Sequence, residues 1–236
     1  MIYKISFYFI LFLIYSIIGW SMEVITSFIR HKKFVNRGFM LGPYCPIYGY
    51  SSIIMIFYLN NYKDNPLTVF LLAIVVCSVV EYLISYLMEK MFSARWWDYS
   101  NRKFNVNGRI CLTNAFIFGI LGIILVYLVN PLFEEILTNI NNNTLTLLGV
   151  ILIILFLSDL ITSLVITFNL KNKIKKLDID VTEELNEKIK TMLETKLLNR
   201  RIFKAYPRYR INIIKKYSKT RREIFKDKID KLKIKK

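Results

Sequence analysis

The sequence has few of the residues on which common enzyme motifs depend. Its 236 residues include one histidine, three cysteines, eight glycines and five prolines. No HExxH, GxSxG or CxxC pattern occurs, and neither does a GxxxxGK[ST] phosphate-binding loop. The chain therefore lacks the usual zinc-protease, serine-hydrolase and dithiol motifs, and it cannot hydrolyse ATP through such a phosphate loop.

Acidic residues are also scarce, and the excess of basic residues is uneven along the chain. The sequence has 34 Lys and Arg against 17 Asp and Glu, although 54% of its residues are hydrophobic. Residues 1–169 carry 11 basic and 8 acidic residues, whereas residues 170–236 carry 23 and 9. High hydrophobicity and high charge therefore belong to different stretches. We predict a transmembrane domain over residues 1–170 and a basic tail over residues 171–236.

Long apolar runs dominate the first of these stretches. They cover roughly residues 5–29, 43–60, 67–92, 110–131 and 144–169. A helix needs about 20 apolar residues to cross a bilayer, and buried helices of soluble proteins are usually shorter. The sequence therefore predicts an all-α, polytopic protein of the cell membrane with about five transmembrane helices.

Lys and Arg collect in alternate loops between these runs. The first loop contains Arg30, Lys32, Lys33 and Arg37, and the third contains Lys90, Arg95, Arg102, Lys103 and Arg109. The extreme N-terminus and the second loop have one lysine each, and the fourth loop has none. Because short basic loops stay in the cytoplasm, we predict an external N-terminus and a cytoplasmic C-terminal tail.

Two of these loops end in similar sequences. Asn36-Arg37-Gly38-Phe39-Met40-Leu41 leads into the second run, and Asn107-Gly108-Arg109-Ile110-Cys111-Leu112 opens the fourth. Each follows a run with a late glutamate, Glu23 or Glu89. The match indicates a parallel repeat of helix pairs 1-2 and 3-4, an architecture known from transporters. Chance or shared cap chemistry would account for it equally well.

Four carboxylates, those of Glu23, Glu81, Glu89 and Asp159, lie inside or at the ends of apolar runs. An ionised carboxylate at membrane depth costs several kcal/mol unless it is paired or hydrated, so such residues are functional candidates. Arg37, Arg95 and Arg109 flank the helix ends that Glu23 and Glu89 approach, and they are the natural counter-charges. Two interpretations stay open: ion pairs that hold the helices together, or a cluster that binds substrate or performs catalysis.

The third loop is the most distinctive stretch because it mixes aromatic side chains with fixed donors and acceptors. An interfacial belt explains Trp96 and Trp97, but it does not explain the charged and amide residues among them, which suit an anionic headgroup or another anion. The predicted polar cluster comprises Glu23, Asn36, Arg37, Glu81, Glu89, Arg95, Trp96, Trp97, Asp98, Asn107, Arg109 and Asp159.

Cys45, Cys77 and Cys111 lie in or at apolar runs, without CxxC or His-paired spacing. Cysteine in such a setting behaves as a small buried apolar residue. We therefore predict no metal site and no cofactor.

Several long motifs resemble a known family. They are Gly19-Trp20-x-x-Glu23, the stretch from Phe34 to Gly49 that ends in Gly-Pro-x-Cys-Pro-Ile-Tyr-Gly, and the stretch from Arg95 to Leu112 that begins Arg-Trp-Trp-Asp-Tyr-Ser. Over roughly residues 10–170 the chain resembles the bacterial ABC-transporter type IV (CmpB-like) membrane proteins. The resemblance implies a permease-like subunit, which would need a separate ATPase subunit. No EAA-type coupling loop is visible, and residues 95–109 are the candidate docking surface.

The basic tail favours association with anionic lipid, at about 1 kcal/mol per charge near the membrane surface. No nucleic-acid-recognition module is visible, so nucleic acid is not an expected partner. Three functions remain open: a transport subunit, a membrane-embedded enzyme acting on a lipid or headgroup, and a non-catalytic lipid-binding scaffold. The lack of a catalytic motif favours a non-enzymatic role, and self-association into a homo-oligomer stays open.

Overall fold

The computed structural model describes residues 1–32, 34–36, 38–92 and 95–176. Most of the predicted basic tail, from residue 177 onward, lies outside this part of the chain. The chain divides into two compact units. Unit 1 comprises Met1–Leu87 and Asp98–Leu164, and unit 2 comprises Met88–Trp97 and Val165–Lys236. Each unit is considered by itself below.

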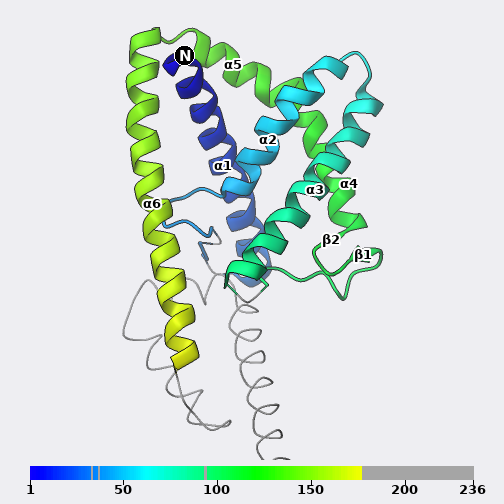
Figure 1. Cartoon of the computed structure of the whole chain (residues 1–236). Helices are drawn as coiled ribbons and strands as arrows, with labels where there is room; N and C mark the ends of the chain where they lie inside the picture. Colours follow the sequence, from blue (N-terminus) through cyan, green and yellow to red (C-terminus); the bar gives the residue numbers. More distant parts are fainter. Residues whose placement is uncertain (33, 37, 93–94, 177–236) are drawn as a thin grey trace, which may run out of the picture. The chain divides into compact units, whose positions relative to one another are not determined.

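The described residues are almost entirely helical (Figure 1). The elements are α1 (Ile2–His31), α2 (Pro46–Leu59), the 3-10 turn η1 (Asn60–Tyr62), α3 (Pro66–Phe92), β1 (Asn105–Val106), β2 (Ile110–Cys111), α4 (Leu112–Ile124), the π-helical turn η2 (Leu125–Val129), α5 (Asn130–Thr138) and α6 (Asn142–Lys176). The strands form one small antiparallel hairpin in which Asn105 pairs with Cys111.

Four stretches are long and apolar enough to cross a membrane: Ile2–Ile29, Pro66–Phe92, Leu112–Thr138 and Asn142–Asn169. The predicted helical membrane protein is therefore confirmed. α2 has 14 residues, and at 1.5 Å per residue it extends about 21 Å, less than the roughly 30 Å hydrocarbon core. Its predicted run, 43–60, begins as an irregular loop and becomes helical at Pro46. A count of five spans stays a prediction.

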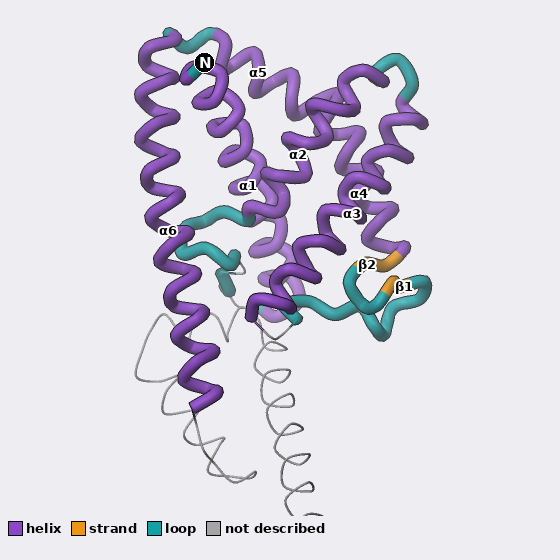
Figure 2. The backbone as a smooth tube through the Cα atoms, in the orientation of Figure 1, coloured by secondary structure: helices purple, strands orange, loops and turns teal. Residues whose placement is uncertain are grey.

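The loop after α1 folds back along that helix. The Cys45 N–H donates to the Ser16 carbonyl at 2.9 Å, and the Trp20 Nε1–H donates to Asn36 Oδ1 at 2.8 Å. α2 therefore starts beside the middle of α1, with its proline at the first helical position, where no amide donor is needed. Figure 2 shows this loop running between α1 and α6.

Small residues allow the helices of unit 1 to approach closely. A Cβ on Gly49 of α2 would lie 2.3 Å from Ser16 Oγ of α1, and a Cβ on Gly122 of α4 would lie 2.3 Å from the Ala73 Cβ of α3. Such contacts are typical of membrane helices, which pack through small side chains. Larger apolar residues, among them Leu11, fill the core between these contacts.

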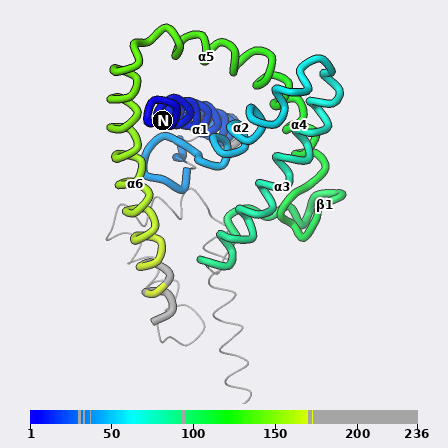
Figure 3. The backbone as a smooth tube through the Cα atoms, turned by 45° about the horizontal axis from the view of Figure 1, so that its top comes forward, coloured from blue at the N-terminus to red at the C-terminus, as the bar shows by residue number. Residues whose placement is uncertain are grey.

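α5 connects the α4 segment to α6 and passes the N-terminal half of α1 (Figure 3). The fourth predicted run, 110–131, is therefore continued by η2 and α5, and the apolar span reaches Thr138. The Tyr15 hydroxyl of α1 donates to Asn130 Oδ1 at the start of α5, at 2.8 Å. Both residues are buried, so this bond fixes α5 against α1.

Candidate functional site

Glu23 of α1 meets Tyr48 in the first turn of α2. The Tyr48 hydroxyl donates to Glu23 Oε1 at 2.9 Å. The tyrosine ring crosses α1 directly over Gly19, where an added Cβ would lie 2.2 Å from Tyr48 Cγ. Gly19 therefore provides the space through which Tyr48 reaches the carboxylate one turn further along α1.

Glu81 of α3 forms a second pair of the same kind with Tyr99. The Tyr99 hydroxyl donates to Glu81 Oε1 at 3.1 Å. The Glu81 residue is 7% exposed, and among the residues that the structure describes, no group donates a hydrogen bond to its second oxygen, Oε2. The backbone N–H of Tyr99 donates to the Gly108 carbonyl at 2.8 Å, which fixes Tyr99 beside the turn between β1 and β2.

Tyr99 lies in the loop after α3, and its environment keeps its phenol protonated. Burial, followed by the charge of Glu81, raises the pKa of the Tyr99 phenol above its ordinary value. The hydroxyl therefore remains a hydrogen-bond donor throughout the physiological pH range.

The two pairs lie within electrostatic range of one another. The charge of Glu23 acts on both Glu81 and Tyr99, and Tyr99 interacts with Tyr48. Glu23, Tyr48, Glu81 and Tyr99 are therefore called the tyrosine–carboxylate cluster. It joins α1, α2, α3 and the loop before α4, all within unit 1.

Asp159 of α6 fixes the loop that precedes α2. Its oxygens accept the backbone N–H groups of Leu41 at 2.8 Å and Gly42 at 2.7 Å. The hydroxyl of Tyr44 also donates to Asp159, as does that of Ser163 at 2.9 Å. Four donors surround this carboxylate, an arrangement that satisfies a charge and holds irregular backbone in place.

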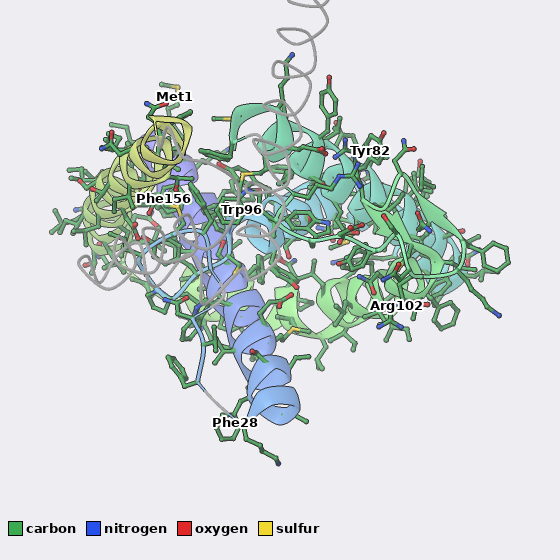
Figure 4. The ribbon with its side chains drawn as sticks, turned by 90° about the horizontal axis from the view of Figure 1, so that it is seen from below. Met1, Phe28, Tyr82, Trp96, Arg102 and Phe156 are labelled. Atoms are coloured by element: carbon green, nitrogen blue, oxygen red, sulfur yellow. The ribbon has the colours of Figure 1, made fainter. Side chains whose placement is uncertain are left out.

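An aromatic contact supports the Asp159 attachment. Phe156, labelled in Figure 4, lies on α6 close to α1. Its ring centroid is 5.4 Å from that of Phe12 of α1 and 5.6 Å from that of Tyr44 in the loop. The aspartate and the phenylalanine together connect α6, the loop and α1.

The hairpin loop is fastened to α3 by Asn107 and Arg109. The Asn107 side chain donates to the Tyr82 hydroxyl at 3.0 Å. The Arg109 guanidinium lies 5.5 Å from the ring centroids of both Tyr82 and Tyr86, within cation–π range. Figure 4 shows Tyr82 on α3. The turn needs left-handed backbone, with φ of 53° at Asn107 and 68° at Gly108, a conformation that asparagine tolerates and glycine favours.

Unit 2 contains an ion pair of its own. Arg95 Nε lies 3.1 Å from Glu89 Oε2, with the two side chains 28% and 32% exposed. Trp96 is buried, and its ring centroid lies 5.8 Å from that of Phe92. Trp97 is half-buried in the same segment.

Comparison with known sequences places the chain in a family. The profile described as "Putative ABC-transporter type IV" matches residues 10–164, about two thirds of the chain. The chain belongs to this family. No curated protein and no solved structure matches it.

In this ABC-transporter type IV protein, the residues of the predicted polar cluster occupy several distinct places. Glu23 and Glu81 belong to the tyrosine–carboxylate cluster. Asn36 accepts a hydrogen bond from Trp20, and Asp159 accepts one from the backbone of the loop before α2. Asp98 accepts hydrogen bonds from the N–H and the hydroxyl of Ser100 at 2.9 and 2.5 Å. Asn107 and Arg109 lie in the turn between β1 and β2 and contact Tyr82 of α3. Glu89, Arg95, Trp96 and Trp97 belong to unit 2. Arg37 lies outside the described residues.

Sequence reasoning missed the tyrosines of the ABC-transporter type IV protein. The sequence suggested arginines as the partners of the carboxylates, and the described part of the chain contains such a pair, Glu89 and Arg95. The bonds that Tyr48 and Tyr99 make to Glu23 and Glu81 span 25 and 18 positions. No periodicity indicates such pairings, because they arise from loops that fold back. Within residues 1–32, 34–36, 38–92 and 95–176, no group of three His, Cys, Asp or Glu forms a metal-binding cluster.

Proposed function

We propose that this protein is the permease-like, membrane-spanning subunit of an ABC-type transporter whose ATPase is a separate chain. Family membership and the four apolar helices support this assignment, and the sequence has no phosphate-binding loop of its own. The observation that carries it is the tyrosine–carboxylate cluster, because carboxylates within apolar helices are costly and mark solute or ion pathways.

The folded-back loops support a transport path through unit 1. Irregular backbone at membrane depth is tolerated where it is buried in protein or lines an aqueous cavity. Here one loop reaches Ser16 on α1 and is bonded to Asp159 on α6, and the other reaches Glu81 on α3. Transporter binding sites are commonly built from such interrupted segments. We propose that the cluster lines the solute path.

We further propose residues 95–109 as the docking surface for the ATPase. The described hairpin presents Phe104, which is 78% exposed, and Val106, which is 51% exposed. Arg102 and Lys103 stand beside them. The Asn105 side chain donates to the Arg102 carbonyl at 2.8 Å and so stiffens the turn that precedes β1. A stiff, exposed apolar turn with basic neighbours suits a partner contact better than a passive connection.

The repeat of helix pairs and the fifth crossing also belong to this proposal. In both halves an asparagine after the long helix bonds an aromatic side chain of that helix, Asn36 to Trp20 and Asn107 to Tyr82. This correspondence supports a parallel repeat. We propose that α2 and the preceding loop together complete a fifth crossing.

The remaining parts of the proposal concern the ends of the chain. Alternation of Lys and Arg in the loops supports an external N-terminus and a cytoplasmic C-terminus. We propose residues 1–170 as the membrane domain and residues 171–236 as a basic tail on anionic lipid.

Purification in mild detergent tests the transport function. An ATPase with a phosphate-binding loop should co-purify with the wild-type chain, and its ATP hydrolysis should change when the two are reconstituted together. The variant with Phe104→Ala, Arg102→Gln and Lys103→Gln should lose this partner. Phe34→Ala is the matched control, because Phe34 is an exposed loop phenylalanine outside the hairpin. A stoichiometric lipid without an ATPase would instead favour the enzyme, and neither partner would favour the scaffold.

A further inference from the structure

We propose that the tyrosine–carboxylate cluster binds a singly charged cation, with Glu81 Oε2 as its principal ligand atom. A cationic solute or a coupling cation would occupy this site in a transporter, and that role rests on the proposed function. The binding itself is a property of unit 1 and can be measured without any ATPase.

The unsatisfied oxygen of Glu81 is the first argument. A carboxylate accepts about four hydrogen bonds, but among the described residues Glu81 receives one at Oε1 and none at Oε2. The residue is 7% exposed, so water does not replace the missing partners freely. A buried carboxylate in this condition is costly unless a positive charge or a proton joins it. The bare oxygen marks the place where such a charge would bind.

The second argument is that a second carboxylate adds to the negative potential at this position. Glu23 lies close enough to act electrostatically on Glu81 and on Tyr99. Like charges within a low-dielectric interior repel strongly. A cation placed at Glu81 Oε2 would relieve this repulsion as well as neutralise Glu81.

The donor atoms indicate the class of cation. The cluster offers carboxylate and phenol oxygens, which suit hard cations, whereas zinc and other transition metals favour nitrogen and sulfur ligands. Cys77, one turn away on α3, directs its thiol to Met55 Sδ at 3.7 Å and not to the cluster. No three-residue metal cluster exists in the described part of the chain. In the described part of the chain, Glu81 Oε2 is the buried carboxylate oxygen of the cluster that receives no hydrogen bond. A single positive charge, on an alkali ion or a small ammonium group, would match that one oxygen.

The tyrosines leave room for such a ligand. Each hydroxyl uses its proton on a carboxylate, at 2.9 Å from Tyr48 and 3.1 Å from Tyr99. The phenol oxygens therefore retain acceptor capacity toward a metal ion. Their rings would also stabilise an ammonium group by cation–π attraction. The same four side chains thus accept either source of charge, and experiment distinguishes the two.

The test is a cation titration of the full-length protein in detergent, exchanged first into N-methyl-D-glucamine chloride. Sodium, potassium and methylammonium chlorides are then added at constant ionic strength while the melting temperature is followed by tryptophan fluorescence. We expect at least one of them to raise the melting temperature by several degrees in a saturable way. A response to sodium or potassium alone identifies an alkali-ion site, and a response to methylammonium alone identifies an ammonium site.

Variants connect this response to the cluster. Glu81→Gln should abolish it, and Glu23→Gln should weaken the apparent affinity about tenfold through the lost charge. Glu135→Gln is the matched control, because Glu135 is an exposed carboxylate on α5, and it should respond like the wild type. If Glu81→Gln does not fold, Glu81→Asp decides, since it keeps the charge and should keep a saturable response with altered affinity.

The proposal is overturned if none of the three cations gives a saturable response, including the case in which pH alone changes stability. It is also overturned if Glu81→Gln folds and still binds the cation with the affinity of the wild type. Where Glu81→Gln does not fold, wild-type cation affinity in Glu81→Asp overturns the proposal. Cation binding without a co-purifying ATPase would leave this site intact and refute the transport subunit. A co-purifying ATPase without cation binding would support the transport subunit and overturn the cation site.

Discussion

The hydroxyl of Tyr99 donates to Glu81 Oε1 at 3.1 Å, although Tyr99 follows the end of α3 and Glu81 lies well inside that helix. The loop must therefore return along α3 by more than two turns before α4 begins. Tyr48 and Glu23 stand in the corresponding relation to α1. Glu23 and Glu81 are thus reached by phenols, Glu81 from the loop after α3 and Glu23 from the first turn of α2.

The Tyr99 phenol should stay protonated up to at least pH 9. Because the pKa of Tyr99 is raised in the folded protein, its contribution is fully present below the unfolded value of about 10 and is lost as pH rises through the folded value. Tyr99→Phe should lower the free energy of unfolding by about 1.5–3 kcal/mol, as for a bond to a charged group. The loss, measured by denaturation in detergent, should still be present at pH 9.

Tyr62→Phe is the control for this measurement, since Tyr62 is exposed in η1 and should change stability little. A difference between Tyr99→Phe and the wild type that disappears by pH 8 would show that Tyr99 ionises there and would contradict the proposed hydrogen bond.

Gly19→Ala should destabilise unit 1 by crowding one ring. An alanine Cβ would lie 2.2 Å from Tyr48 Cγ, so Tyr48 must move and leave Glu23. Overpacking of this kind costs about 1–3 kcal/mol. A double-mutant cycle measures it: in a Tyr48→Ala background the added methyl group meets no ring, and the cost should fall close to zero. An equal cost in both backgrounds would mean that the ring is not the obstacle.

Asp159→Asn should weaken the attachment of the first loop to α6. The amide retains one acceptor oxygen but turns a donor toward N–H groups such as those of Leu41 and Gly42. We expect a loss of about 2–3 kcal/mol in unfolding free energy. Asp64→Asn, at an exposed position between α2 and α3, is the matched control and should be near neutral. A loss no larger than that of the control would show that the contacts of Asp159 do not stabilise the loop.

The sequence predicted the helices better than it predicted the site, for a physical reason. The length of an apolar run can be counted directly in the sequence, and a helix that crosses a membrane needs such a run. The four long helices were therefore predicted from 67–92 and similar stretches. Glu89 and Arg95 are six positions apart, and local charge pairing found them as well. The contacts of Tyr48, Tyr99 and Tyr44 depend on where a loop returns, and no local pattern encodes that path.

The orientation of the chain makes a separate prediction. Reporter fusions after residues 35, 100 and 236 should read as cytoplasmic, and fusions at 63 and 140 as external, because Lys and Arg are concentrated in the first and third loops and in the tail. Alkaline phosphatase and fluorescent-protein fusions measure the two sides independently. A cytoplasmic signal at residue 140 would contradict the five-crossing topology.

The last prediction concerns Glu89 and Arg95 in unit 2. Their side chains are about one third exposed, and ion pairs in such settings contribute about 0–1 kcal/mol. Glu89→Gln should therefore leave the melting temperature and the abundance in the membrane close to those of the wild type. If the pair belongs to a functional surface, activity in the cell should nevertheless fall, and the reversed pair Glu89→Arg with Arg95→Glu should restore any part that depends on mutual attraction. Matched losses of stability and activity would instead assign the pair to the fold. Normal stability together with normal activity would remove it from the candidate site, because neither structure nor function would then depend on the charge of Glu89.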